Sequence, residues 1–423
     1  MAVRGDETGV KEAARQWAQR DLSELLSTSA KSIGAGSATD AGRSWRLPTD
    51  HPDPIVLAGG IPDAPTLPVD DFRRALDHVL ATEPEEALQY GGWLGFEGLR
   101  EVIAERQSRI EGTELGADNY IIHNGSSGSV DNICKAFIEP GDVVVTEAPS
   151  FSGTVRSMRG YGAEIVQAEM DEHGVVVSSI ADILARLKRE GKRVKFFYTI
   201  ADFHNPTGVT LTEDRRAELI KLCAEHEVLI VEDAAYTELF FGDVPPPSIY
   251  SMVEGQGVMR LGSLSKNIAT GLRVGWVQAL PAYIDALSRV RFDMGNNPLF
   301  HRALAEYISD GKLEDHIAAM RPIYAEKCRA LCDSLAEHCG PYVRFSKPEG
   351  GFFLWVECLG ALASEVAGAA AQEGLIFAQG QNFFHEKSES TDHYLRFAFS
   401  NASVERIAEA GVRLRKAFLK VVD

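Results

Sequence analysis

Short apolar runs alternate with helical patterns through the middle of the chain. The runs lie at 120–123, 142–146, 164–168, 193–199, 228–232, 258–261 and 272–278. Between them, apolar residues recur at helical spacing in 130–138, 178–189 and 213–226. Strands that alternate with helices in this way form βαβ units. The pattern therefore predicts an α/β fold with a large domain, in which helices flank a mostly parallel sheet.

A smaller α/β domain follows a long helical region at 280–338. Its expected strands are 342–346, 352–357, 375–378 and 393–399, and a helix at 402–421 closes the chain. Before the large domain, the spacing predicts one amphipathic helix at about 9–27, and the Ser-, Gly-, Ala- and Pro-rich stretch 27–53 predicts an extended arm. We therefore divide the chain into an N-terminal helix and arm (1–54), a large domain (55–310) and a small C-terminal domain (311–423).

Composition and charge narrow the class of protein. The hydrophobic share of 45% and the charged share of 25% are typical of a globular chain. A net charge of −18 argues against nucleic acid and anionic membranes as partners, and no run approaches 18 apolar residues. The six cysteines form no CxxC pair, which favours reduced core thiols. Residues 1–11 lack the apolar core of a signal peptide, so we expect a cytoplasmic protein.

One lysine carries the most informative chemistry. Lys266 leaves a short apolar run through small hydroxyl residues, which places it well to form an imine with an aldehyde. Ser263, Ser265 and Arg273 around it supply the hydroxyl and guanidinium donors that hold a phosphate dianion. An aldehyde and a phosphate on one small molecule indicate pyridoxal 5'-phosphate, held as a lysine Schiff base. For this segment alone, a solvated lysine on a loop is the alternative.

Two carboxylates end the apolar run 228–231. A carboxylate beside the pyridine nitrogen of the cofactor stabilises the protonated ring, and Asp233 is our candidate for this role. Side chains alternate along a strand, so Glu232 is expected on the opposite face. Tyr236 is placed to donate to the ring's phenolic oxygen. Asn205, in the turn Asn-Pro-Thr-Gly, is positioned against the same oxygen, although Asn-Pro-x-Gly alone indicates only a turn.

An anion site and a cation complete the set of candidates. The small-residue turn 124–129 opens a helix N-terminus, where free backbone N–H groups favour a phosphate. An N-cap without a ligand is equally consistent with that turn alone. Arg396 projects from an alternating strand at 394–399. It is either a satisfied salt bridge or, in an amino-acid enzyme, the bidentate clamp for the substrate α-carboxylate.

Together these motifs resemble the fold-type-I, pyridoxal-phosphate-dependent aminotransferases of class I/II, and most closely the 2-aminoadipate and kynurenine aminotransferase branch. The resemblance runs from about Ile55 to the C-terminus. Besides the segments above, it includes the stretches 58–63, 88–90, 95–100, 147–151, 198–200 and 348–355.

The resemblance implies a role for each matching residue. Lys266 would be the Schiff-base lysine, Asp233 the pyridinium partner, and Asn205 and Tyr236 the contacts of the ring oxygen. Phe151 would stack on the ring, and Arg396 would hold the substrate carboxylate beside Gly60 and Asn205. The expected phosphate-binding residues are Ser126, Ser127, Gly128, Ser263, Ser265 and Arg273, joined by Tyr90 from the neighbouring subunit of a homodimer with shared active sites.

The chain departs from the branch at several positions. The phosphate turn reads Ser126-Ser127-Gly128 where Ser-Gln-Gln is usual, and Phe151 stands where Tyr is more common. His204 and His301 lie where amide side chains are more common, and Gln379-Gly380 replaces a Pro-Gly. For both histidines the alternative is a satisfied structural role.

Three functions compete at this stage. The first is an aminotransferase that moves the amino group of an α-amino acid to a 2-oxo acid, and we favour it. The second is a pyridoxal-phosphate enzyme of specialised metabolism on the same fold, catalysing elimination or replacement, oxidative decarboxylation or carbon–carbon bond formation. The third is a ligand-sensing transcription regulator. It is disfavoured because only about 54 residues with one clear helix and no basic face precede Ile55.

Overall fold

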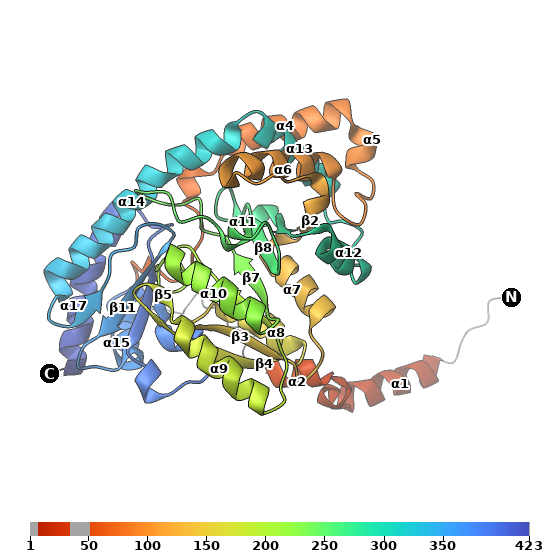
Figure 1. Cartoon of the computed structure of the whole chain (residues 1–423). Coiled ribbons are helices and arrows are strands. Elements are labelled where there is room, and N and C mark those ends of the chain that lie inside the picture. The colour runs from red at the N-terminus through yellow and green to blue at the C-terminus, as the bar shows by residue number, and fades with distance from the viewer. Residues whose placement is uncertain (1–6, 34–50, 423) are drawn as a thin grey trace.

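The computed structural model describes residues 7–33 and 51–422 (Figure 1). Its main sheet has eight strands in the order β2-β9-β8-β7-β6-β3-β4-β5. They are β2 (Tyr120–His123), β3 (Val143–Ala148), β4 (Glu164–Asp171), β5 (Gly174–Val175), β6 (Val194–Thr199), β7 (Leu229–Asp233), β8 (Val258–Ser263) and β9 (Gly275–Gln278). The block β8-β7-β6-β3-β4 is parallel, and antiparallel strands flank it at both ends. The predicted α/β fold is thus confirmed.

Helices cover both faces of this sheet. One face packs against α7 (Gly125–Phe137) and α8 (Ser152–Gly160), whose apolar residues join the largest core cluster. The opposite face packs against α9 (Val177–Arg189), α10 (Glu213–Glu225) and α11 (Ile249–Met252). Parallel strands need cover on both faces, which is why 143–145 is an uninterrupted run of buried valines.

A helical layer lies beside the β2 edge. It consists of α4 (Val69–Thr82), α5 (Pro84–Ala87), α6 (Glu97–Glu111), α12 (Pro281–Arg289) and α13 (Pro298–Ser309). Residues of α6 and α13 form a second apolar cluster with β2 and β9.

A second, antiparallel sheet lies in the C-terminal part. Its order is β10-β11-β14-β13, formed by β10 (Val343–Phe345), β11 (Phe353–Cys358), β13 (Ala378–Gln379) and β14 (Tyr394–Ala398). The helices of this part are α14 (Lys312–Cys339), α15 (Ala363–Gln372), α16 (Val404–Ala408) and α17 (Ala410–Val422). The short strand β1 (Ile55–Val56) pairs with β12 (Leu375–Ile376), so the chain touches this part before it enters the main sheet.

The prediction of a single helix at 9–27 is wrong. Instead, α1 (Glu7–Gln19) ends, a 3-10 turn η1 (Leu22–Leu25) follows, and α2 (Thr28–Ile33) forms separately. Asp21 causes the break, because its carboxylate accepts a hydrogen bond from the Ser23 amide at 2.9 Å and caps the new turn. Residues 34–50 of the expected arm lie outside the described residues.

Other boundaries differ from the predictions for local reasons. The expected helical region 280–338 is three helices, because residues 294–296 and Gly311 have positive φ angles that interrupt a helix. The helix expected at 130–138 begins at Gly125, so the serine turn is itself the first turn of α7. The strand expected at 272–278 begins only at Gly275, because Arg273 adopts a left-handed φ of 52°. The closing helix at 402–421 is split into α16 and α17.

All six cysteines are buried and unpaired, as expected for core thiols. Within the described ranges, no helix is long and apolar enough to cross a membrane.

Candidate active site

The carboxyl ends of the parallel strands border a cavity of about 1870 Å³. Asp233 is the last residue of β7, Lys266 comes three residues after β8, and Asn205 comes six residues after β6. Eleven of the fourteen residues expected at the site line this cavity, namely Gly60, Ser126, Ser127, Phe151, Asn205, Asp233, Tyr236, Ser265, Lys266, Arg273 and Arg396.

The other three expected residues do not line the cavity. The Ser263 hydroxyl is buried and accepts a hydrogen bond from the Ser265 amide at 3.1 Å, so within this chain it shapes the turn before Lys266. Gly128 packs near Asn124 and His123, one turn inside α7. Tyr90 is 83% exposed, so within one chain it lies on the surface.

Lys266 lies among the residues that line the cavity. Its Nζ donates to the Gly60 carbonyl at 2.6 Å and lies 5.8 Å from the centre of the Tyr236 ring. The pKa of Lys266 is lowered to about 8, first by burial and then by the positive charges of Arg396 and Arg273, while the Asp233 carboxylate opposes this shift. An amine with this pKa is a far better nucleophile near neutral pH than an ordinary lysine.

Asp233 is held by a buried relay of hydroxyl groups. Tyr198 donates to Asp233 Oδ2 at 2.7 Å, and Thr154 donates to the Tyr198 oxygen at 3.2 Å. The Ala235 amide donates to Oδ1 at 3.2 Å. Burial raises the pKa of Asp233, and the hydrogen bonds from Tyr198 and Ala235 oppose this rise. These hydrogen bonds orient the carboxylate, and a cation placed beside it would stabilise its charged form.

Glu232 points away from the cavity, as the alternation predicts. Its two carboxylate oxygens accept hydrogen bonds from the amides of Ile249 and Tyr250 at 3.0 and 3.1 Å. It therefore anchors α11 on the opposite side of the sheet.

The N-terminus of α7 meets Arg273 at one end of the cavity. The Arg273 Nη2 atom donates to the Asn124 carbonyl at 3.0 Å, and a Cβ on Gly125 would lie 2.8 Å from that nitrogen. A Cβ on Gly275 would lie 2.7 Å from the Ser126 amide nitrogen. Backbone crowding favours glycine at 275, and a φ of +75° favours glycine at 125. The first amides of α7 therefore lie beside a guanidinium, which is a cradle for an anion.

Arg396 lies at another part of the lining, between two aromatic rings. Its guanidinium carbon is 4.4 Å from the centre of the Phe353 ring and 4.6 Å from that of Phe383. Nη1 donates to Asn205 Oδ1 at 2.8 Å and Nη2 to the Ala58 carbonyl at 2.6 Å. Nε is buried without a hydrogen-bond partner among the described residues, and burial lowers the pKa of Arg396 to about 10. Such a guanidinium is stabilised by a carboxylate ligand.

Tyr236 lines the cavity between the aromatic residues Phe352 and Phe353 and the side chain of Asn205. Its ring packs edge-on against Phe352 and Phe353, and its hydroxyl interacts with the Asn205 side chain. Burial raises the pKa of Tyr236, which keeps the phenol protonated as a donor.

The two unusual histidines lie outside the lining. His204 is buried, with Nε2 3.0 Å from Glu147 Oε2 and Nδ1 2.9 Å from Thr207 Oγ1. His301 is buried on α13, and burial lowers its pKa to about 4. His204, between Glu147 and Thr207, therefore has the structural setting that was its alternative. His301 is also buried away from the cavity, but its Nε2 atom has no hydrogen-bond partner among the described residues. Gln379, in contrast, does line the cavity.

Sequence reasoning missed Tyr198, Thr154 and Phe383. Tyr198 had a usable signal, because a buried tyrosine in a core strand needs a partner for its hydroxyl. The other two belong to segments far apart in the chain, and no local pattern links them to Asp233 or Arg396.

The chain matches the family model of aminotransferase class I and II over residues 52–414. It belongs to this family. An aromatic-amino-acid aminotransferase of Thermococcus litoralis is 33% identical over 366 residues, which cover 86% of this chain and 87% of that protein.

Solved structures agree with the family model. The kynurenine aminotransferase of Pyrococcus horikoshii, solved with PMP, superposes with a TM-score of 0.88 at 31% identity, covering 95% of this chain and 98% of that one. The alpha-aminoadipate aminotransferase of Thermus thermophilus, complexed with N-(5'-phosphopyridoxyl)-L-leucine, has a TM-score of 0.85 at 28% identity, covering 95% and 99%. This aminotransferase therefore transfers an amino group between an amino acid and a 2-oxo acid.

Family membership implies pyridoxal 5'-phosphate as the cofactor. The residues present fit this group. The cavity offers an amine of lowered pKa, a buried carboxylate, and a helix N-terminus beside an arginine, and these suit an aldehyde, a pyridine nitrogen and a phosphate respectively.

Proposed function

We propose that Lys266 is the residue to which the cofactor's aldehyde attaches, with Asp233 as the partner of the pyridine nitrogen. The position of the Lys266 amine carries this proposal, because it lines the same cavity as the Asp233 carboxylate and the α7 cradle, and its pKa is lowered. When bound, pyridoxal phosphate supplies an electron sink for the charge that develops at the substrate Cα. Tyr198 and Thr154 orient the Asp233 carboxylate for its role.

The remaining residues divide into a phosphate group and a substrate group. Ser126, Ser127, Ser265 and Arg273 hold the phosphate, with Ser263 and Gly128 shaping the two turns that present them. Phe151 covers the ring, and Asn205 and Tyr236 donate to its phenolic oxygen. Arg396, with Asn205 and the backbone of Gly60, receives the substrate carboxylate.

In the reaction, this chain's own groups bind, orient and move a proton. Arg396 fixes the carboxylate, which sets the direction in which the Cα–H bond points. The Lys266 amine then takes the proton from Cα as a general base, because a pKa near 8 leaves a useful neutral fraction at physiological pH.

We infer that the amino donor has a large aromatic side chain. Seven Phe and Tyr residues line the cavity: Phe151, Tyr161, Tyr236, Phe353, Phe377, Phe383 and Phe384. The relatives whose names specify aromatic amino acids and kynurenine support the same class.

We also propose a homodimer in the cytoplasm. Tyr90 projects from the surface and contributes to a phosphate site only if it is that of a neighbouring copy. The six buried free thiols suit a reducing compartment. Residues 55–310 and 311–423 are proposed as the large and small domains, since the eight-stranded sheet lies within the first range and the four-stranded sheet within the second.

Borohydride reduction of the yellow holoenzyme tests the central residue. Reduction fixes an imine to its amine, and peptide mass mapping should find the cofactor on Lys266 alone. Lys266→Ala should still fold and bind the cofactor through the phosphate contacts, but without turnover. An adduct on any other lysine would refute the assignment.

A further inference from the structure

Two cations of the cavity, Lys266 and Arg396, donate hydrogen bonds to one short stretch of backbone. The Gly60 carbonyl accepts from Lys266 Nζ at 2.6 Å, and the Ala58 carbonyl accepts from Arg396 Nη2 at 2.6 Å. The stretch 58–60 reads Ala-Gly-Gly, so it has no side chain longer than a methyl group. The residues on either side of it must therefore fix where the two carbonyls lie.

Backbone pairing fixes this stretch on its N-terminal side. The Leu57 amide donates to the Ile376 carbonyl at 2.7 Å, and the Leu57 carbonyl accepts from the Ala398 amide at 2.7 Å. Both partners belong to strands, β12 and β14. The chain therefore enters the stretch from a firmly held position.

Side chains fix the stretch on its C-terminal side. The Ser400 hydroxyl donates to the Ile61 carbonyl at 2.6 Å, and the Asp63 amide donates to the Tyr324 hydroxyl at 3.2 Å. Lys327 of α14 joins these contacts, because its Nζ lies 2.8 Å from Asp63 Oδ1 and donates to the Ser400 carbonyl at 3.0 Å. One ammonium group thus ties the segment 58–63 both to α14 and to the residues that follow β14.

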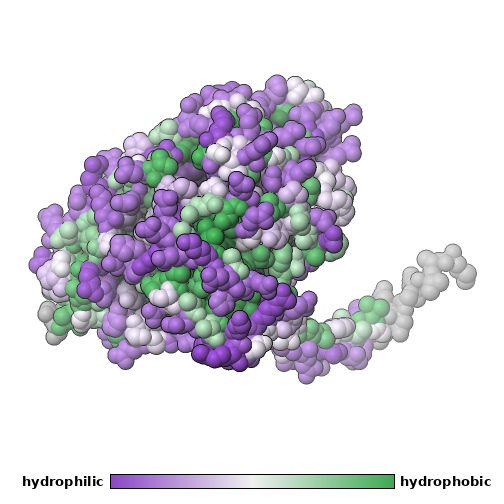
Figure 2. All heavy atoms as spheres, in the orientation of Figure 1, coloured by the Kyte–Doolittle hydropathy of each residue, from purple (hydrophilic) through white to green (hydrophobic). Residues whose placement is uncertain are grey.

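Lys327 lies where a lysine is rarely found. Hydrophilic residues cover much of the visible face of the molecule in Figure 2, and lysine side chains ordinarily lie on such surfaces. The Lys327 side chain is instead only 4% exposed, and that of Asp63 is 11% exposed. A buried ion pair adds little stability over an apolar pair of the same size, because both charges lose their water. What this pair adds is a fixed position for the segments that it joins.

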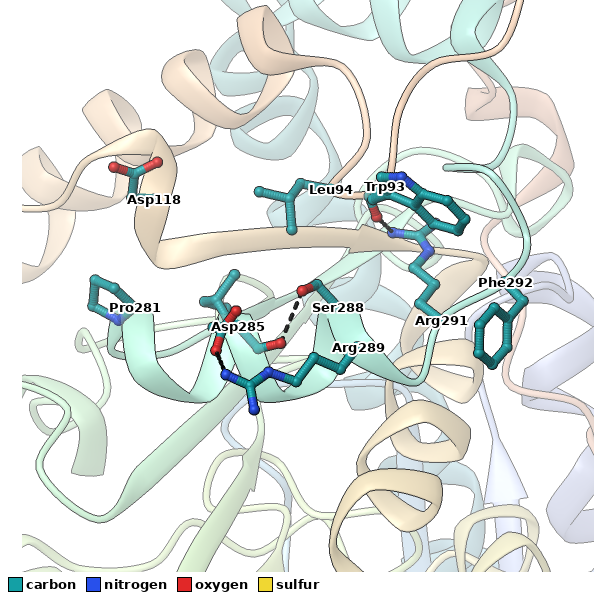
Figure 3. Close-up of a pocket in the computed structure, with 10 residues that line it drawn as sticks. Trp93, Leu94, Asp118, Pro281, Asp285, Ser288, Arg289, Arg291 and Phe292 are labelled. Carbon is teal, nitrogen blue, oxygen red and sulfur yellow. Dashed lines mark hydrogen bonds and ion pairs between the residues drawn. The ribbon is translucent and has the colours of Figure 1, made fainter.

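Arg291 shows how a buried cation fixes a loop in this chain. Its side chain is 2% exposed, and it donates to the Trp93 carbonyl at 2.9 Å in a groove beside α12 (Figure 3). It also donates to Asn296 Oδ1 at 2.7 Å, so two loops are joined through one guanidinium. Lys327 has the same kind of geometry, but the segment that it holds carries two carbonyls of the active site.

The orientation of Arg396 depends on that segment. Its Nη2 atom bonds to the Ala58 carbonyl and its Nη1 atom to Asn205, while Nε has no hydrogen-bond partner among the described residues. Two bonds therefore set the direction in which the guanidinium presents its remaining donors. A shift of the segment removes one of these two bonds and leaves the aromatic lining in place.

We propose that Lys327 is a positioning residue of the reaction. It holds the segment 58–63 so that the Ala58 carbonyl keeps the Arg396 guanidinium directed at the substrate carboxylate. Lys327 is not among the described residues that line the cavity, so it acts through the segment and not by touching the substrate. The inference rests on the proposed function, because it takes Arg396 as the residue that binds the carboxylate.

Binding of a carboxylate that cannot react measures this effect. The probe is hydrocinnamate, and its amide, hydrocinnamamide, has the same ring and chain without the charge. Isothermal titration calorimetry of the holoenzyme with each compound gives the ratio of the two affinities. That ratio reports the carboxylate contact, because a general change in the fold or in the aromatic lining affects both compounds alike.

Lys327→Met combined with Asp63→Asn removes both charges together, so no unpaired charge stays buried and the fold should be kept. We expect the affinity for hydrocinnamate to fall by about fivefold or more, with the affinity for hydrocinnamamide unchanged. The matched control is Lys195→Met with Asp142→Asn. It removes an ion pair of 3.1 Å at the amino ends of β6 and β3, the opposite edge of the sheet, and should change neither affinity.

A milder variant guards against loss of the fold. Asp63→Asn alone keeps the size of the side chain and one acceptor oxygen, so we expect a folded protein and a smaller fall in the ratio, of about twofold. An unchanged ratio in either folded variant would overturn the proposal. An equal loss of affinity for both compounds would do the same, because it would show a structural role only.

Arg396→Gln separates this proposal from the proposed function. It should abolish the preference of the enzyme for hydrocinnamate over its amide. If the preference survives Arg396→Gln, the assignment of Arg396 fails and the role of Lys327 fails with it. If Arg396→Gln abolishes the preference but the charge-free double variant keeps it, only the role of Lys327 is refuted and the proposed function stands.

Discussion

At the scale of single residues, the reactivity of Lys266 results from what surrounds its amine. Burial disfavours the ammonium form, the guanidinium groups of Arg396 and Arg273 add repulsion, and the Asp233 carboxylate opposes them. The same arrangement makes Lys266 oppose folding at low pH, because its pKa is about 8 in the folded chain and 10.5 in the unfolded chain. Between these two pH values the unfolded chain holds a proton at Lys266 that the folded chain has released. This contribution to stability therefore improves as the pH rises through that window.

The rate at which the apoenzyme captures the cofactor should follow this pKa. The neutral amine is the nucleophile, so the rate, measured by absorbance in a stopped-flow experiment, should rise with pH and reach half its maximum near pH 8. Arg396→Gln removes a nearby positive charge and should move the midpoint upward, whereas Arg186→Gln, on the exposed face of α9, should not. A midpoint at the ordinary lysine value in the unchanged enzyme would show that the amine is not perturbed.

At the scale of elements, the anion cradle depends on how closely β9 approaches the start of α7. A Cβ on Gly275 would lie 2.7 Å from both the Gly125 carbonyl carbon and the Ser126 nitrogen, so backbone must move to admit it. The amides at the helix N-terminus would then shift away from a bound phosphate.

Gly275→Ala should therefore weaken retention of the cofactor by about fivefold or more, since overpacking costs about 1–3 kcal/mol. Gly271→Ala is the matched control, because a Cβ there meets no described atom within 4 Å. Dissociation constants from equilibrium titration of the two apoenzymes would compare them. Equal retention in both variants would mean that the α7 N-terminus does not hold the phosphate.

The elements also show what a sequence can and cannot predict. The alternation of apolar runs predicted the strands, and alternation within β7 correctly separated Asp233 from Glu232. Asp21 broke the arm helix because a carboxylate that caps a turn competes with helical periodicity. The Tyr198–Thr154 relay and the Phe383 contact with Arg396 join segments distant in the chain, so only the packed fold reveals them.

At the scale of the whole molecule, one cavity is lined by the Lys266 amine, the Asp233 carboxylate and the guanidinium groups of Arg273 and Arg396. The amino-group transfer of this family proceeds in two halves. After one amino group has been transferred to the cofactor, the enzyme must wait for a 2-oxo acid. An enzyme that eliminated or replaced a side-chain group would need no such acceptor.

The most direct test is therefore a single half-reaction. Holoenzyme is mixed with a panel of amino acids, aromatic ones included, without any 2-oxo acid, while the cofactor spectrum and the products are followed. We predict that the spectrum changes once, that one 2-oxo acid forms per active site, and that added 2-oxo acid restores the original spectrum. Repeated turnover of any amino acid without an acceptor, with the spectrum unchanged, would contradict this function.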